Sequence, residues 1–228
     1  MLNTSDRYGD YLLIDRQEAL IASLRAQPLV VVLRPEYDDL EASSHRSALF
    51  TMLEQLHVAG VRHVELAWSP HPGWMPLMRQ VQDCFADFCL GAASVSSPEA
   101  LHAASELGLA YAMTPCWDPA LDEQARQMQQ VLIPGLFSPT EIQQACRCGC
   151  RLVKLFPASV LGIDYLRQLA GPMDYLPFVI AAGGLTVSDL NPWLDAGYDA
   201  IALGRGLVQQ GQLDPALQSY LKTSTSTD

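Results

Sequence analysis

The chain has 228 residues, of which 49% are hydrophobic and 17% are charged, and its formal net charge is −11. This length fits one large domain or two small ones, and the composition is that of a globular protein. The acidic balance speaks against a nucleic-acid partner, because phosphate backbones are bound by clustered Lys and Arg. A polar first segment and the lack of any apolar run long enough for a bilayer predict a cytoplasmic protein with no membrane partner.

Apolar runs of strand type alternate with amphipathic helical stretches, which is the pattern of a parallel sheet built from βα units. After a leader helix over 14–26, the predicted strands are 29–33, 61–66, 88–90, 110–113, 131–133, 152–156, 178–182 and 200–203. Capping residues and first-turn prolines help to place the helices. These are predicted near 44–59 and 163–170, from Trp74 and Thr186 onward, and after Ser97, Asp118 and Ser138.

Eight such units in a chain of this length predict a (β/α)8 TIM barrel. The predicted division is an N-terminal extension and leader helix over 1–27, a barrel over 28–210, and a C-terminal helix and polar tail over 211–228. A doubly wound open sheet stays open as an alternative. Its nucleotide-binding form loses support because no Gly-x-Gly-x-x-Gly follows the first strand.

Lysine is scarce in this chain, which has only Lys154 and Lys222. Lys154 lies inside an apolar strand, and the sixth strand of a barrel faces the second, which carries Glu65. Burial lowers the pKa of an amine and makes it a better nucleophile, while a nearby carboxylate opposes that shift and supplies acid–base catalysis. The alternative is a buried ion pair that only holds the barrel together. Because such pairs add little net stability, the functional interpretation is favoured.

Three cysteines, Cys146, Cys148 and Cys150, alternate with other residues and suggest a metal site at first sight. They include no CxxC pair, and no histidine is near, so the usual zinc spacing is missing. We therefore expect small apolar residues at a helix end and a strand start, and no metal.

The order and spacing of several segments carry a resemblance to a known family. They are Gly60-Val61-Arg62-His63-Val64-Glu65, Gly91-Ala92-Ala93-Ser94-Val95, Ile133-Pro134-Gly135, Ser138-Pro139-Thr140-Glu141 and Val153-Lys154-Leu155-Phe156-Pro157-Ala158. From about Leu29 to Val208 the chain resembles the 2-keto-3-deoxy-6-phosphogluconate / 4-hydroxy-2-oxoglutarate aldolases, which are class I aldolases of the barrel fold. The resemblance implies that Lys154 is the Schiff-base lysine and Glu65 the general acid/base. It also implies a homotrimer, no metal and no added cofactor.

The position that binds the substrate carboxylate in the family differs in this chain. Many members carry an Arg four residues after the catalytic Glu, and this chain has Ser69 there. Arg34, after the first strand, is a candidate replacement because its guanidinium binds carboxylates in a bidentate manner. The alternative for Arg34 is a surface ion pair with Glu36 or Asp38.

The loops after strands seven and eight also differ from the family. Ala182 stands where members have Thr, and Arg205 follows Gly204 where members often have Ser. These loops form the phosphate cradle of many barrels through backbone N–H groups, and their glycines also suit tight turns. The predicted substrate-binding residues are Arg34, Ser94, Pro115, Phe156, Gly183, Gly184, Gly204 and Arg205.

The sequence therefore predicts a lyase for a small anionic 2-oxo acid. The expected substrate is a 2-keto-3-deoxy-6-phospho sugar acid or 4-hydroxy-2-oxoglutarate, cleaved to pyruvate and an aldehyde. One alternative is a phosphate-binding barrel isomerase or synthase in which Lys154 is merely electrostatic. Another is an inactive relative that binds a metabolite, which Ser69 and Ala182 favour and the Glu65–Lys154 pair opposes.

Overall fold

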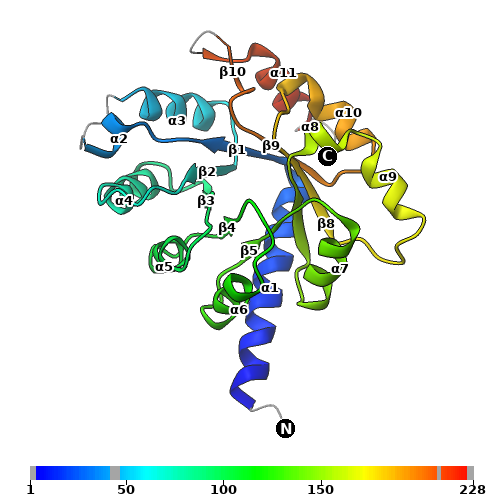
Figure 1. Ribbon diagram of the computed structural model, residues 1–228. Coiled ribbons are helices and arrows are strands. Elements are labelled where there is room, and N and C mark those ends of the chain that lie inside the picture. Colours follow the sequence, from blue (N-terminus) through cyan, green and yellow to red (C-terminus); the bar gives the residue numbers. More distant parts are fainter. Residues whose placement is uncertain (1–3, 42–46, 210–211, 225–228) are drawn as a thin grey trace.

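The computed structural model describes residues 4–41, 47–209 and 212–224, and its parallel strands form a barrel surrounded by helices (Figure 1). The strands are β1 (Leu29–Leu33), β2 (His63–Ala67), β3 (Cys89–Ala93), β4 (Tyr111–Met113), β5 (Leu132–Ile133), β6 (Gly135–Leu136), β7 (Leu152–Leu155), β8 (Phe178–Ala182) and β9 (Ala200–Leu203). Their hydrogen-bonded order is β5-β4-β3-β2-β1-β9-β8-β7-β6. Only Pro134 separates β5 from β6, so the two ends of this order are halves of one segment and the barrel closes there. The predicted barrel is confirmed and the open sheet is wrong.

The helices follow the strands in the alternating order expected of βα units. They are α2 (Tyr37–Glu41), α3 (Ala48–Val58), α4 (Trp74–Cys84), α5 (Pro98–Glu106), α6 (Pro119–Gln127), α7 (Pro139–Arg147), α8 (Ala158–Leu161), α9 (Tyr165–Ala170), the 3-10 turn η1 (Val187–Asp189), α10 (Leu190–Asp195) and α11 (Pro215–Ser224). A short hairpin of β10 (Val208–Gln209) and β11 (Gln212–Leu213) precedes α11. Among the described helices, none combines the length and apolarity needed to cross a membrane.

Three helix starts were predicted from cap and proline signals, and the structure confirms them. The side chains of Ser97, Asp118 and Ser138 each accept backbone N–H groups of the first turn, and a proline follows each cap. At Ser138 the reciprocal bond from the backbone to Glu141 completes a capping box. Local side-chain chemistry is enough to place these ends, because each bond joins residues within one turn.

Other element bounds differ from the prediction. The leader helix α1 (Thr4–Ala26) starts ten residues earlier than expected, and no proline interrupts the sequence before Pro28. The third strand extends through Ala93, because its small residues pair with β2 all the way to Ala67. Helix α9 stands where one was expected near 163–170, whereas the short helices α8 and α2 were not predicted. Positions 44–46 of the helix expected near 44–59 lie outside the described residues.

Helix α1 packs against the amino-terminal ends of the strands. Its buried side chains Leu20, Ile21 and Leu24 join a cluster with inward-facing strand residues that include Val30, Tyr111, Ile133, Leu152, Phe178 and Ala200. The alternate strand residues, such as Leu29 and Val31, pack outward against the ring of helices. The barrel is thus covered by α1 at one end, and its carboxyl-terminal end carries the loops.

His63 links α1 to the barrel from inside β2. It is fully buried, its Nδ1 lies 3.2 Å from the Leu29 carbonyl oxygen, and its Nε2 lies 2.8 Å from the Ser23 hydroxyl. Since a carbonyl only accepts, Nδ1 donates to Leu29 and Nε2 accepts from Ser23. Burial lowers the pKa of His63 to about 4, so the ring is neutral at neutral pH.

The lowered pKa of His63 predicts a loss of stability on acidification. Above its unfolded-state value near 6.5 the ring is neutral in both states, whereas at lower pH only the unfolded chain takes up a proton. This group alone should lower the free energy of unfolding by about 2 kcal/mol between pH 7 and pH 5. In denaturant titrations at both pH values, the stability advantage of the parent over His63→Gln should shrink by that amount. An advantage of constant size would show that His63 does not titrate in this way.

Candidate active site

Lys154 and Glu65 occupy the middle of two strands on opposite sides of the barrel. Lys154 in β7 stands in register with Gly135 and Ile180, and Glu65 in β2 stands between Val32 and Gly91. Strand alternation turns both side chains inward, where they are 8% and 1% exposed. The structure therefore brings the two residues singled out from the sequence into one buried interior.

The electrostatics of this pair are dominated by burial. Desolvation raises the pKa of Glu65 and lowers the pKa of Lys154, and the charge of each partner opposes the shift of the other. The thiol of Cys116 acts on the pKa of Lys154 in the same direction as Glu65. Within the described residues no direct ion pair joins the two side chains, and Glu65 Oε1 has no hydrogen bond of ordinary length, although the Tyr111 hydroxyl is near enough to lower the pKa of Glu65. The site holds an amine whose charged form is disfavoured beside a carboxyl group that can take or give a proton.

Phe156 follows β7 and lies next to the lysine. The centroid of its ring is 5.3 Å from Lys154 Nζ, within the range of a cation–π contact. The ring also reaches the loop after β8, where an added Cβ on Gly183 would lie 2.8 Å from it. Phe156 thus connects Lys154 to the glycine pair. The sequence predicted substrate binding for Phe156 and for both glycines.

Arg34 and Arg205 are exposed at the carboxyl ends of β1 and β9, which are neighbouring strands. Within the described part of the chain, neither guanidinium forms an ion pair or hydrogen bond. The surface pair of Arg34 with Glu36 or Asp38 is not formed, and the nearby Asp39 carboxylate instead accepts the Glu36 backbone N–H. Both cations are therefore available to an anionic ligand at this end of the barrel.

The loops after β3 and β4 hold two other predicted residues. Ser94 is half-buried with φ at 59°, an uncommon conformation for a residue other than glycine. Pro115 is exposed in a turn that the Thr114 hydroxyl closes by bonding the backbone of Cys116 in both directions. An added Cβ on Gly135 would collide with the Pro115 carbonyl, so this glycine lets β6 approach the turn closely.

The glycines after β8 and β9 form turns as the sequence allowed. Gly183 and Gly184 have φ values of 95° and 79°, which favour glycine. A single parallel bridge joins Thr186 to Gly206 and sets the two loops side by side. Gly204 has no such conformational need, since an added Cβ would meet only the Val32 carbonyl oxygen at 3.8 Å. The backbone angles show that Gly183 and Gly184 form turns. That these loops bind phosphate is part of the function proposed below.

Two sequence features have structural explanations apart from substrate. Ser69, in the place of the family arginine, accepts the His71 backbone N–H at 3.3 Å. Cys150 is buried and its thiol donates to Asp122 at 3.4 Å. No group of three or more His, Cys, Asp or Glu within the described residues is arranged to hold a metal.

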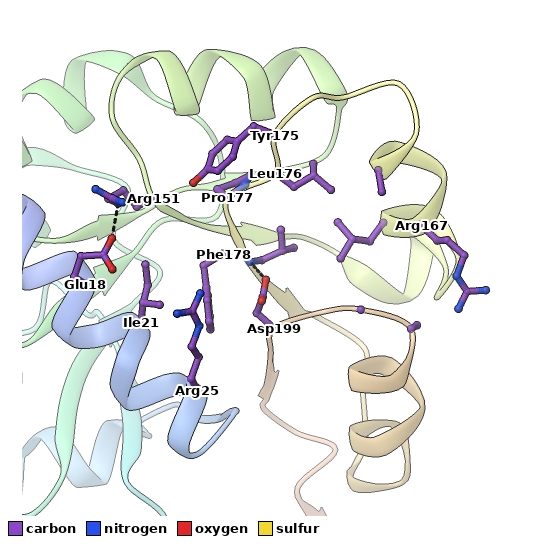
Figure 2. A pocket seen from close by; sticks show the side chains of 15 residues that line it. Glu18, Ile21, Arg25, Arg151, Arg167, Tyr175, Leu176, Pro177, Phe178 and Asp199 are labelled. Carbon is purple, nitrogen blue, oxygen red and sulfur yellow. Dashed lines mark hydrogen bonds and ion pairs between the residues drawn. The ribbon is translucent and has the colours of Figure 1, made fainter.

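Two pockets lie at the opposite end of the barrel, between α1 and the strand starts. The larger encloses about 480 Å3, and Figure 2 shows Glu18 and Arg25 of α1 on one side of it, facing Phe178 and Asp199. Glu18 forms an ion pair with Arg151 there at 2.6 Å. The second pocket encloses about 290 Å3 on the side of α6 and α7. Neither is lined by Lys154 or Glu65, so we place the candidate site at the other end.

Sequence reasoning missed two residues beside the pair. Tyr111 of β4 is fully buried, and the charge of Glu65 contributes to its raised pKa. Cys116 follows Pro115 and is near enough to influence Lys154. An aromatic residue in a strand is ordinary in a barrel core, so only strand register could have placed Tyr111 next to Glu65.

Comparisons with known proteins agree with this arrangement. The family model described as KDPG and KHG aldolase matches residues 21–218. The chain belongs to this aldolase family. As a member of an aldolase family it is a lyase, and its fold is the barrel described above.

Individual relatives give the same picture. The chain is 30% identical to the 2-dehydro-3-deoxy-6-phosphogalactonate aldolase of Escherichia coli (strain K12), over 81% of this chain and 86% of that one. The solved structure described as native KDPGal is 25% identical with a TM-score of 0.69, covering 87% of this chain and 93% of that one. The Legionella pneumophila KDPG aldolase, with pyruvate captured as a covalent carbinolamine intermediate, is 19% identical with a TM-score of 0.69 over 90% and 94% of the two chains.

Removal of the Glu65 carboxylate tests its place in the site. Glu65→Gln should slow aldol cleavage by roughly two to four orders of magnitude, the range of a general acid–base group. The measurement is steady-state cleavage of a 2-keto-3-deoxy-6-phospho sugar acid, with Glu106→Gln as a control on the surface, where Glu106 pairs with Arg79. Parental turnover in Glu65→Gln would reassign Glu65 to a structural role.

Proposed function

We propose that this protein is a class I aldolase that cleaves a small anionic 2-oxo acid to pyruvate and an aldehyde through a Schiff base on Lys154. The observation that carries the proposal is the buried Lys154 amine facing the Glu65 carboxyl group inside the barrel of an aldolase family member. Burial keeps a fraction of the amine neutral, and only the neutral amine attacks a carbonyl. The carbinolamine of the Legionella pneumophila relative supports the same chemistry here.

The reaction proceeds in steps that these two residues can perform. The Lys154 amine adds to the C2 ketone, and loss of water from the carbinolamine leaves an iminium. Glu65 removes the proton of the C4 hydroxyl, the C3–C4 bond breaks, and its electron pair moves into the iminium to form an enamine and the free aldehyde. The enamine takes a proton at C3, and water then hydrolyses the pyruvate iminium and frees Lys154.

The exposed arginines are suited to the two ends of the substrate. We assign the substrate carboxylate to Arg34, because Ser69 cannot supply a cation and its hydroxyl already accepts a backbone N–H. We assign the distal anion to Arg205 and the backbone of Gly183, Gly184 and Gly204, with phosphate favoured over a second carboxylate. Ser94, Pro115 and Phe156 would line the path between these ends. The homotrimer and the cytoplasmic location stay predictions of the sequence.

An isomerase or synthase would use the same barrel with Lys154 only as a charge, and an inactive relative would bind its ligand without forming an imine. Incubation with pyruvate and borohydride separates these readings, because borohydride captures only an imine. We expect one reduced pyruvate unit per chain, found by peptide mass spectrometry on Lys154 and absent from Lys154→Arg. Label on Lys222 alone, or no label, would overturn the class I mechanism.

The assignment of Arg205 predicts selectivity for phosphorylated substrate. A charge-assisted contact contributes about 1.5–3 kcal/mol, or roughly one to two decades in affinity. Arg205→Ser should therefore weaken a 2-keto-3-deoxy-6-phospho sugar acid by that factor and hardly affect pyruvate trapping. The comparison uses the phosphorylated acid, its unphosphorylated parent and 4-hydroxy-2-oxoglutarate.

The matched control for Arg205 is Arg79→Ser, which removes an equal charge from the surface, where Arg79 pairs with Glu106. This control should leave all three substrates unchanged. Equal efficiency on phosphorylated and unphosphorylated acids, unaltered by the loss of Arg205, would show that the glycine loops are turns only.

A further inference from the structure

Tyr111 is a titratable group in the barrel interior that the proposed reaction does not use. It is fully buried in β4 among inward-facing residues such as Met113 and Ile133. Of the buried side-chain nitrogen and oxygen atoms in the described residues, only Tyr111 Oη and Glu65 Oε1 lack a hydrogen bond of ordinary length, although the two groups are near enough for a hydrogen bond between them to act on the pKa of each. Buried polar atoms are rarely left unbonded because their desolvation is costly, so two such atoms in one interior call for an explanation.

The strand register explains how the tyrosine comes to the glutamate. Glu65, Gly91 and Tyr111 stand level on β2, β3 and β4. An added Cβ on Gly91 would lie 2.7 Å from two atoms of the Tyr111 ring. The ring therefore lies over β3 in the space that this glycine leaves, on the way from its own strand to that of Glu65. Any other residue at position 91 would compete for that space.

We propose that Tyr111 is a positioning residue for Glu65, whose hydroxyl donates a hydrogen bond to the ionised carboxylate and holds it toward Lys154. This inference rests on the proposed function, since it concerns the state in which Glu65 acts as base. The phenol is suited to this part because it carries a donor at the end of a rigid ring held by packing. A hydrogen bond to a charged acceptor is also stronger than one between neutral groups.

Among the described titratable groups around Glu65, Tyr111 is an uncharged oxygen donor at neutral pH. Lys154 faces it from β7 and opposes the rise of its pKa. Burial raises the pKa of Cys89 on β3 to about 11, and it lowers the pKa of His63, on the same strand as Glu65, so that the ring is neutral. Burial and the charge of Glu65 raise the pKa of Tyr111 well above its usual value, so the phenol keeps its proton. Cys116 acts on Lys154 from the loop after β4.

The sign of the pH effect follows from this arrangement. A hydrogen bond to the ionised form lowers the pKa of a carboxyl group, so loss of the phenol should raise the pKa of Glu65 further. Because the base must be ionised to act, the acid limb of the kcat profile should move to higher pH. A tyrosine that only fills space would not move this limb when replaced by phenylalanine, which keeps the ring.

The experiment compares Tyr111→Phe with the parent and with Tyr198→Phe, which removes another buried hydroxyl near the Gly162 carbonyl. In Tyr111→Phe we expect kcat at neutral pH to fall by about 10- to 100-fold and the acid limb to rise by about one pH unit, with little change in KM. Tyr198→Phe should match the parent. An unchanged kcat profile in Tyr111→Phe would overturn the proposal.

A second readout does not depend on turnover. In protein labelled with carbon-13 at the glutamate side-chain carboxyl group, the Glu65 signal is identified by its loss in Glu65→Gln, and its titration should move upward in Tyr111→Phe. Gly91→Ala, which displaces the ring but keeps the hydroxyl, should move it in the same direction. If the parent neither traps pyruvate nor cleaves substrate, the proposed function fails, while a Glu65 titration that is the same in all three proteins refutes the tyrosine contact alone.

Discussion

The burial of a lysine and a glutamate in one apolar barrel is the constraint on which the rest of this structure depends. Lys154 and Glu65 are almost fully removed from water, and burial disfavours the charged form of each. A buried pair of this kind costs stability compared with apolar residues of similar size, so its presence is more easily explained by chemistry than by folding. The apolar packing of α1 and the outer helices must offset that cost. The barrel in turn holds the two groups on β7 and β2, which lie on opposite sides of its interior.

Stability and chemistry are accordingly divided between the two ends of the barrel. At the amino-terminal end, the polar groups that meet α1 are bonded: Gln17 to the Arg151 backbone, Ser23 to His63, and Gln27 to the Arg62 backbone. Arg34 and Arg205, which are exposed and have no ion-pair partner among the described residues, stand at the other end. The bonded groups fix the base of the barrel, and the exposed arginines at the loop end can exchange their water for an anionic ligand.

The sequence could predict those features that depend on neighbouring residues along the chain. Helix starts at Ser97, Asp118 and Ser138 depend on side chains within one turn, and Lys154 was conspicuous as a lone cation in an apolar strand. Pairing between strands was harder to foresee. Gly91 to Ala93 belong to β3 only because β2 and β4 lie beside them, and Tyr111 meets Glu65 only because Gly91 lies level with both. Such features depend on register, which single-strand patterns do not contain.

Register also relates the departures from the family pattern to the two exposed arginines that we propose bind the substrate. The arginine expected after β2 and the hydroxyl expected after β8 are absent at Ser69 and Ala182, while Arg34 and Arg205 follow β1 and β9. β1 pairs with β2 and β9 pairs with β8, so Arg34 stands one strand away from the arginine it would replace, and Arg205 stands one strand away from Ala182. Neighbouring parallel strands are about 4.8 Å apart, a distance that an extended arginine side chain spans. If an arginine moves to the neighbouring strand, it therefore approaches the substrate from another direction, and its distance from the substrate changes less. On this argument, the same acid could be held by a different pair of loops, with Lys154 and Glu65 kept in place by the barrel itself.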